Sequence, residues 1–147
     1  MLSNRISIEK YFIQIAQDVS LRGTCIRMKV GCVLVDSMNH ILSTGYNGPA
    51  IGQPHCIDIP CPGAKIEAGR NTNTCDAIHS EANALLQCSD VQKIVTAYIT
   101  HSPCRNCIKL LLNTSCQVII YKHLSSGVHT DAINLWIKAG RLIEQVK

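Results

Sequence analysis

Two short motifs in this chain combine residue types that bind metal ions and transfer protons. Cys104 and Cys107 lie three residues apart after Pro103, and His79 and Glu81 lie upstream in the sequence His-Ser-Glu. In a helix, two cysteines at this spacing share one face, and the positive N-terminal end of the helix favours the thiolate form that zinc requires. His79 would complete a set of three protein ligands, the number found in catalytic zinc sites, where the fourth position binds water.

Glu81 is predicted to be a catalytic residue and not a zinc ligand. Side chains two apart on a helix do not share a face, so Glu81 is poorly placed to bind the same ion as His79. Its longer side chain can reach the zinc-activated water and act as a general acid and base. A cysteine pair alone could also be a redox dithiol or half of a structural zinc site, but neither explains Glu81. The order His-x-Glu and then Pro-Cys-x-x-Cys is the signature of zinc nucleobase deaminases.

The hydrophobic pattern predicts an α/β fold that positions these motifs at helix starts. Ser102 is expected to be the N-cap, and Pro103 the first residue, of the helix that carries the two cysteines. The alternation predicts a three-layer α/β/α sandwich around a five-stranded mixed sheet, an antiparallel hairpin followed by parallel strands. The expected helices are 7–21, 79–88, 103–113 and 129–139, and the expected strands are 30–35, 41–46, 94–100, 118–121 and 142–146.

Length and composition limit the classes of protein that this chain can be. With 147 residues, 46% hydrophobic and 16% charged, we expect a single domain over residues 1–147. The apolar runs are too short to span a membrane, and the first residues lack a signal-peptide core, so we predict a cytoplasmic protein with no membrane partner. The net charge of +4 is scattered, which argues against a nucleic-acid polymer as partner.

The two motifs and the segments around them resemble the cytidine and deoxycytidylate deaminase family, and within it the deoxycytidylate deaminases. The supporting segments are Lys-Val-Gly at 29–31, Gly-Tyr-Asn-Gly at 45–48 and Asn-Ala at 83–84. The matching pieces cover the chain from about Cys25 to Tyr121, in family order. The family usually has alanine where this chain has Ser80, whose hydroxyl could add a hydrogen bond near Glu81.

The resemblance implies a cytidine deaminase-like fold and the hydrolytic deamination of dCMP to dUMP and ammonia, which supplies dUMP for dTMP synthesis. Zinc would be held by His79, Cys104 and Cys107, while Glu81 would move protons to the cytosine ring and then to the departing amine. Other interpretations are a deaminase of dCTP, of free cytidine, of guanine or of tRNA adenosine. A protein of another class, associated with competence, could keep this fold and act through partners.

Four residues are predicted to contact the substrate. The resemblance implies that Asn47 lies near the sugar or the base. Arg27 could hold a phosphate through a bidentate contact, although solvated surface charge explains it as well. Ser102 precedes the cysteine motif, and Tyr121 lies at the end of a predicted parallel strand, where ligands of such sheets bind.

The loop formed by Gly45, Tyr46, Asn47 and Gly48 is a candidate regulatory site. The resemblance implies a homo-oligomer, commonly a hexamer, that dCTP activates and dTTP inhibits, with Mg²⁺ accompanying the nucleotide effector at this loop. Its glycines alone would indicate an ordinary turn at the end of a strand.

Nine cysteines are many for a chain in a reducing compartment, where metal binding explains them better than disulfides. Cys25, Cys56, Cys61 and Cys75 lie in or near the irregular segment 47–75, which is rich in glycine and proline. We predict that they bind a second, structural zinc ion that holds this segment together. His55 is a competing ligand, and the alternative is a set of small buried or free thiols.

Overall fold

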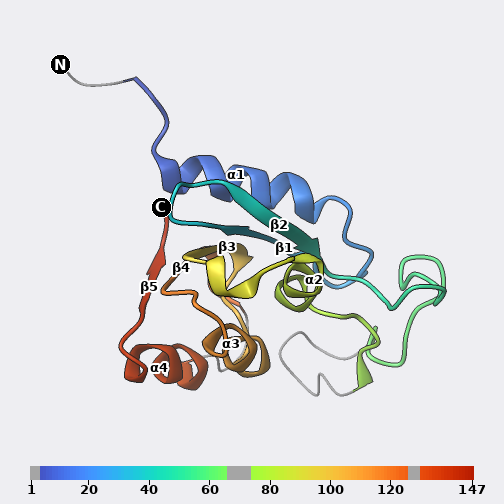
Figure 1. Cartoon of the computed structure of the whole chain (residues 1–147). Helices are drawn as coiled ribbons and strands as arrows, with labels where there is room; N and C mark the ends of the chain where they lie inside the picture. Colours follow the sequence, from blue (N-terminus) through green and yellow to red (C-terminus); the bar gives the residue numbers. More distant parts are fainter. Residues whose placement is uncertain (1–3, 66–73, 126–129) are drawn as a thin grey trace.

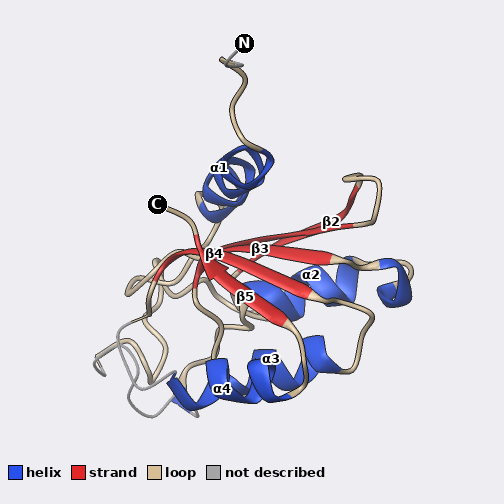
Figure 2. Cartoon of the chain, turned by 90° about the vertical axis from the view of Figure 1, so that its left-hand side faces the viewer, coloured by secondary structure: helices blue, strands red, loops and turns tan. Residues whose placement is uncertain are grey.

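Helices cover both faces of one sheet, as expected for a three-layer sandwich. The computed structural model describes residues 4–65, 74–125 and 130–147. The four helices are α1 (Ile8–Ser20), α2 (Ser80–Gln87), α3 (Arg105–Leu112) and α4 (Thr130–Lys138). Helix α1 packs on one face of the sheet, while α2, α3 and α4 lie on the other (Figure 2). The predicted α/β/α architecture is confirmed.

The sheet is five-stranded and mixed, with the strand order β2-β1-β3-β4-β5 (Figure 1). The strands are β1 (Gly31–Val35), β2 (Ile41–Tyr46), β3 (Thr96–His101), β4 (Val118–His123) and β5 (Leu142–Gln145). Strand β1 pairs antiparallel with β2 and also with β3, whereas β3, β4 and β5 run parallel. The antiparallel hairpin is therefore continuous with the parallel part, and β2 is its outer edge.

Alternating side chains of the strands divide the core between the two faces of the sheet. All five residues of β1 are buried, because helices cover the strand from both sides. The α1 face buries Phe12, Ile13, Ala16, Val33, Val35, Tyr98 and Ile120. The opposite face buries residues from the strands and from α2, α3 and α4, among them Cys32, Leu34, Ala84, Ile99, Ile108, Leu111, Ile119 and Trp136. The larger cluster thus lies under the helices that carry the two motifs.

Most predicted elements are confirmed, and Ser7 caps α1 by accepting a hydrogen bond from Lys10 N at 3.3 Å. The predicted cap of α3 is wrong. Cys104, in extended conformation, is the N-cap, and α3 begins at Arg105. The Ser102 hydroxyl is used elsewhere, because it accepts a hydrogen bond from Ser125 N at 2.9 Å. Ser102 therefore fixes the chain that leaves β4.

Smaller differences concern the ends of other elements. Strand β4 runs to His123, two residues past the predicted end at Tyr121. Strand β3 starts two residues later than predicted, because residues Val91–Lys93 form a short 3-10 helix before it. Helix α4 begins at Thr130, and position 129 of the prediction lies outside the described residues. Among the residues with described positions, no helix has the length and apolar character needed to cross a membrane.

Candidate active site

Three predicted zinc ligands from two separate helices converge on one point. His79 is the N-cap of α2, and Cys104 and Cys107 lie at the start of α3. His79 Nδ1 is 3.4 Å from Cys104 Sγ and 3.5 Å from Cys107 Sγ. Within the described ranges, this is the one group of three histidine, cysteine or acidic side chains whose ligand atoms all lie within 4.8 Å of one another.

The spacing of these donor atoms fits a tetrahedral zinc ion. Zinc lies about 2.3 Å from a thiolate sulfur and about 2.0–2.1 Å from an imidazole nitrogen. Two such ligands at a tetrahedral angle are about 3.6 Å apart, close to both measured distances. One nitrogen and two sulfurs also leave a fourth position for water. The two distances from His79 Nδ1 therefore fit a zinc ion held by these three residues.

The two thiols differ in acidity because they share a proton. A hydrogen bond from Cys107 lowers the pKa of Cys104 to about 3, and His79 adds to this effect. The pKa of Cys107 is raised by the same hydrogen bond, by burial and by the negative charge of Glu81. The Cys104 thiolate in turn raises the pKa of His79. Hydrogen bonding and burial thus favour negative charge on Cys104 over Cys107, and the thiolate is the form of cysteine that binds zinc.

Glu81 is buried beside this donor set, with 4% of its surface exposed. Burial raises the pKa of its carboxyl group, while the charge on His79 and a hydrogen bond from Ser80 oppose that rise. The Ser80 hydroxyl donates to Glu81 Oε2 at 3.0 Å. A carboxyl group with a raised pKa next to a metal site is suited to receive and return protons.

The comparison with known protein families agrees with this geometry. Residues 6–123 match the family described as "Cytidine and deoxycytidylate deaminase zinc-binding region". The chain belongs to this family. It therefore has the zinc-dependent, hydrolytic deamination chemistry of the family, and its His/Cys/Cys site is consistent with a catalytic Zn²⁺.

This deaminase-family chain is similar in sequence to several known proteins. ComE operon protein 2 of Bacillus subtilis (strain 168) is 34% identical over 149 residues, which cover 97% of this chain and 73% of that protein. The deoxycytidylate deaminase of Mycobacterium phage D29 is 35% identical over 120 residues, which cover 77% of this chain and 92% of that protein. That of Schizosaccharomyces pombe is 30% identical over 145 residues, covering 96% of this chain and 44% of the relative. The chain thus spans less than half the length of the yeast enzyme.

Solved structures support the fold of this family member. The dCMP deaminase of the cyanophage S-TIM5 in apo form superimposes with a TM-score of 0.75 at 25% identity, covering 97% of this chain and 99% of that chain. The same phage protein in complex with dCMP and dUMP gives a TM-score of 0.73 at 23% identity. The cytidine deaminase-like fold is therefore confirmed.

Helix α2 of this deaminase-family chain is held against the edge strand β2 by close contacts. A Cβ atom at Gly45 would lie 2.3 Å from both Ala84 N and Ser80 O, so only glycine lets the helix approach this far. The Ser43 hydroxyl donates to Ala84 O at 2.7 Å. The sequence motif does not indicate Ser43, because its role depends on a helix far along the chain. These contacts fix the position of His79 and Glu81.

A second set of contacts holds the segment just before His79. Gly48 and Ile78 form an isolated antiparallel bridge, with N···O distances of 3.2 and 2.7 Å. Asn83 Nδ2 donates to Tyr46 O at 2.8 Å. The predicted regulatory loop from Gly45 to Gly48 is thus part of the frame around the zinc ligands. Its binding of nucleotide effectors stays a prediction.

The predicted substrate contact Asn47 is buried and has backbone partners. Its Oδ1 accepts a hydrogen bond from Val30 N, and its Nδ2 donates to Met28 O, both at 2.8 Å. Asn47 therefore holds the segment that enters β1. This position next to the Gly48 bridge is compatible with a further contact to a ligand, which stays a prediction.

The other predicted substrate residues lie in or after the parallel strands β3 and β4, or in the segment between α1 and β1. Ser102 follows β3 and is bonded to Ser125, as described above. Tyr121 lies within β4 and is buried. Arg27 is half-buried and forms a hydrogen bond with the Cys75 thiol. Their contacts with substrate stay predictions. Because Arg27 is hydrogen-bonded to Cys75, it is not an isolated charge on the surface.

Proposed function

We propose that this protein is a deoxycytidylate deaminase, which converts dCMP and water to dUMP and ammonia. The observation that carries this proposal is the buried carboxyl group of Glu81 beside the donor set of His79, Cys104 and Cys107. Of the relatives described above, the phage and yeast proteins are named deoxycytidylate deaminases. The cyanophage protein of the same fold was solved with dCMP and dUMP. These relatives support dCMP as the substrate.

In this proposal His79, Cys104 and Cys107 hold the zinc ion. Zinc bound there supplies Lewis-acid chemistry, because it lowers the pKa of a coordinated water toward neutrality. The two sulfurs and the nitrogen come from helix starts that are fixed to the sheet, so the ligands are held in place before the substrate binds. Such preorganisation favours catalysis.

Glu81 is the proposed proton carrier. Its carboxylate takes a proton from the water that adds to C4 of cytosine and delivers it to N3 of the ring. The carboxylate then takes the proton of the new C4 hydroxyl group and passes it to the C4 amine, so that ammonia departs and the C4 oxygen becomes the carbonyl of dUMP. Ser80 holds one carboxylate oxygen, so the other oxygen is directed to these transfers. Burial at 4% exposure keeps bulk water from competing for the proton.

The substrate contacts that we propose are Asn47, Arg27, Ser102 and Tyr121. An amide nitrogen has two N–H donors, so Asn47 can bind the substrate while it keeps its bond to Met28 O. Ser102 and Tyr121 belong to the carboxyl-end side of the parallel strands, which supports a position beside the nucleotide. Arg27 would supply positive charge for the phosphate.

A direct test is to incubate the purified protein with dCMP, dCTP, cytidine, guanine and a tRNA anticodon stem and to measure ammonia release. We expect turnover of dCMP at a kcat/KM at least tenfold above that of the other substrates. Turnover of dCTP or tRNA in place of dCMP would contradict the proposal that dCMP is the substrate. Absence of turnover with every substrate would contradict the proposal that the protein is an enzyme.

A second candidate is a competence-associated protein that keeps this fold, and the 34% identity to ComE operon protein 2 over 97% of this chain favours it. Such a protein would act through partners. The ammonia assay separates the two, since a protein that acts only through partners would release no ammonia even when loaded with zinc.

We also propose the regulation that the family resemblance implies. The chain would assemble as a hexamer of a single cytoplasmic domain, with dCTP activating and dTTP inhibiting in the presence of Mg²⁺ at the loop from Gly45 to Gly48. The bridge between Gly48 and Ile78 supports this idea, because it joins that loop directly to the residue before the zinc ligand His79. Light scattering and dCMP turnover with and without each nucleotide test both parts.

A further inference from the structure

Two histidines lie side by side at the carboxyl end of the parallel strands, and the proposed proton transfers do not involve them. His101 is the last residue of β3, and His123 is the last residue of β4. The two residues are paired in the parallel register, and their ring centroids are 5.1 Å apart with an angle of 38° between the ring planes. Ligands of open α/β sheets bind at this end of the strands. The histidine pair is therefore a candidate binding site.

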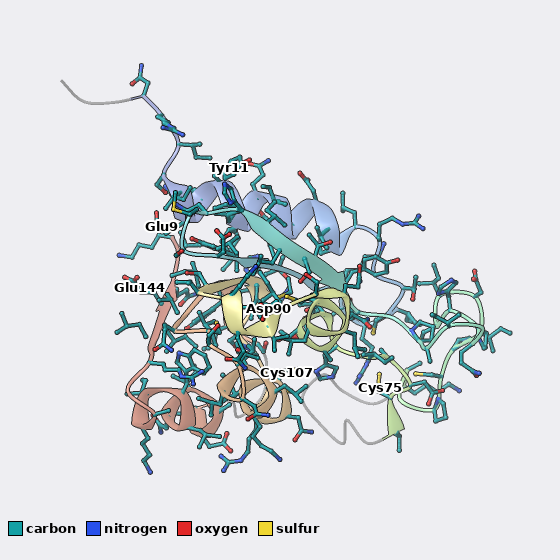
Figure 3. All side chains as sticks on the ribbon, in the orientation of Figure 1. Glu9, Tyr11, Cys75, Asp90, Cys107 and Glu144 are labelled. Carbon is teal, nitrogen blue, oxygen red and sulfur yellow. The ribbon has the colours of Figure 1, made fainter. Side chains whose placement is uncertain are left out.

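Both histidines belong to the face of the sheet that carries the zinc ligands. Side chains alternate along a strand, so His101 shares the face of Ile99, and His123 shares the face of Ile119. Ile99 and Ile119 are part of the core under α2, α3 and α4. Figure 3 shows Cys107, at the start of α3, on this same side of the sheet. A ligand at the histidines can therefore also reach toward the zinc ligands.

Hydrogen bonds hold the strand ends that carry the two rings. Ser102 N donates to His123 O at 2.8 Å, which continues the ladder between β3 and β4. Ser125 N donates to Ser102 Oγ at 2.9 Å, and Ser125 Oγ donates to Ser102 O at 2.8 Å. The segments that follow both strands are thus tied to each other, and the rings project from a fixed edge.

A buried hydroxyl group orients the ring of His101. Thr100 is 3% exposed, and its Oγ1 accepts a hydrogen bond from Gly31 N at 3.2 Å and lies 3.0 Å from His101 Nδ1. The Thr100 O–H can therefore donate to Nδ1, which leaves the proton of the neutral ring on Nε2. Burial lowers the pKa of His101, and charge on His123 lowers it further, so the neutral ring is favoured. His101 thus offers an N–H donor at Nε2.

Two other basic side chains of these elements have partners of their own. Lys122 Nζ donates to Gln17 Oε1 at 3.3 Å, on the face of the sheet that α1 covers. Arg105 Nη1 lies 3.3 Å from Asp131 Oδ2. The ring of His123, in contrast, is exposed at the end of its strand. The two imidazoles are thus better placed than these cations to meet an anion at the carboxyl end of β3 and β4.

We infer that His101 and His123 bind the phosphate group of the nucleotide substrate, an inference that rests on the proposed function. Cytosine C4 must lie at the zinc ligands, so the phosphate lies at a distance from them. The three residues from His101 to Cys104 span at most about 11 Å, which is comparable to the length of a nucleotide. Nε2–H of His101 donates to a phosphate oxygen, and His123 can add a proton and a positive charge. These contacts supplement the charge that Arg27 would supply.

A metal ion is the other ligand that paired histidines could bind. In the described part of the chain, the three zinc ligands of the active site are the one set of three such donors close enough to hold an ion. No third donor therefore joins His101 and His123 among the described residues. The same criterion applies to the predicted structural zinc, since the sulfurs of Cys56 and Cys61 are 3.7 Å apart but no third sulfur completes a set. That site stays a prediction for Cys25, Cys56, Cys61 and Cys75.

The inference is tested with dUMP, the proposed product, and deoxyuridine, which lacks only the phosphate group. Isothermal titration calorimetry on the zinc-loaded protein should show that His101→Gln and His123→Gln each weaken dUMP binding about tenfold or more. Binding of deoxyuridine should stay unchanged. His40→Gln is the matched control, because His40 is exposed in the turn between β1 and β2, where it pairs with Asp36. This variant should bind dUMP as the wild type does.

Equal losses for dUMP and deoxyuridine would overturn the inference, because the histidines would then act on the base, on the sugar or on the fold. Unchanged dUMP affinity in both variants would overturn it as well, even if dCMP is deaminated. Binding needs no turnover, so a chain that deaminates nothing but loses dUMP affinity in these variants would contradict the proposed function alone.

NMR titration of the wild type with inorganic phosphate decides the question if His101→Gln does not fold. The imidazole resonances of His101 and His123, assigned with the help of His123→Gln, should shift as phosphate is added. The resonance of His40 should stay in place. Histidine resonances at 101 and 123 that do not move would contradict the phosphate site.

Discussion

The Ser80 hydroxyl donates a hydrogen bond to Glu81 Oε2 across 3.0 Å, with both side chains buried. This bond orients the carboxylate and favours its ionised form. We expect Ser80→Ala to lower kcat for dCMP about tenfold, because a hydrogen bond to a charged group contributes about 1.5–3 kcal/mol. The acid limb of the kcat/KM profile should move to higher pH. Steady-state kinetics across a pH series measure both changes.

Ser43→Ala is the control for this experiment. It removes the bond from the Ser43 hydroxyl to Ala84 O, on the same helix but away from the carboxylate. It should lower the free energy of unfolding by about 1 kcal/mol while the pH profile of activity stays unchanged. If both variants shift the pH profile equally, Ser80 acts only through the stability of α2.

Glu81→Gln should abolish turnover and leave the metal in place. The amide has nearly the same shape as the carboxyl group but cannot carry a proton, so we expect a loss of at least about 10²–10⁴ in kcat. Zinc content should stay equal to that of the wild type, because the proposed ligands are His79, Cys104 and Cys107. Metal analysis together with the ammonia assay checks this, and loss of zinc in the variant would show that Glu81 is itself a ligand.

Gly45→Ala should damage both stability and activity. The new Cβ atom would lie 2.3 Å from Ala84 N and Ser80 O, both of them backbone atoms, so α2 must move away from β2. Overpacking of this kind costs about 1–3 kcal/mol. Since α2 carries His79 and Glu81, kcat should fall as well. Thermal unfolding and dCMP turnover measure the two effects.

The matched control is Gly48→Ala. Its Cβ atom would meet Thr24 Oγ1 at 3.1 Å, a side-chain atom that can move. We expect a smaller change in melting temperature than for Gly45→Ala. An equal decrease in melting temperature in the two variants would mean that α2 can move away from β2 at little cost in stability.

Asp36 should make the stability of the β1–β2 hairpin depend on pH. The backbone N–H groups of His40 and Met38 donate to Asp36 Oδ1 at 2.9 and 2.8 Å, and they lower the pKa of this carboxyl group. A lowered pKa means that the ionised form stabilises the folded state. This stabilisation is present above the unfolded pKa of about 3.9 and is lost as pH falls through the folded value.

The test compares the wild type with Asp36→Asn, which keeps an oxygen acceptor but has no charge. At pH 6–7 the variant should melt at a lower temperature than the wild type, and the difference should shrink as the pH falls below the unfolded pKa of about 3.9 and through the lower folded pKa. Melting curves of both proteins over this pH range measure the difference. A difference that does not depend on pH would show that the charge of Asp36 has no role.

The convergence of His79, Cys104 and Cys107 could be predicted from sequence because each motif encodes its own geometry. Spacing on one helix start determines how Cys104 and Cys107 present their sulfurs, and the same holds for His79 and Glu81. The meeting of the two helices follows from the alternation of strands and helices. Local pattern was therefore sufficient for the donor set that the structure brings together.

The errors concern interactions between segments far apart in the chain. Ser102 has the residue type of a helix cap, but Ser125, which follows another strand, takes its hydroxyl. Likewise nothing near Gly45 indicates that a helix more than thirty residues later requires its missing side chain. The pairing of β1 with both β2 and β3 is also a property of the whole sheet. Such partners become visible only when the chain is folded.

The bridge between Gly48 and Ile78 pairs the two ends of the segment that connects β2 to α2. Its two ends are tied together one residue before the first zinc ligand, so the length of the loop is uncoupled from the position of His79. Doubling a flexible loop costs only about 0.6 kcal/mol in closure entropy. The chain can therefore accept an inserted peptide near the exposed residue Ile51 without displacing the zinc ligands, which makes this loop a natural place to attach a reporter or a new binding segment.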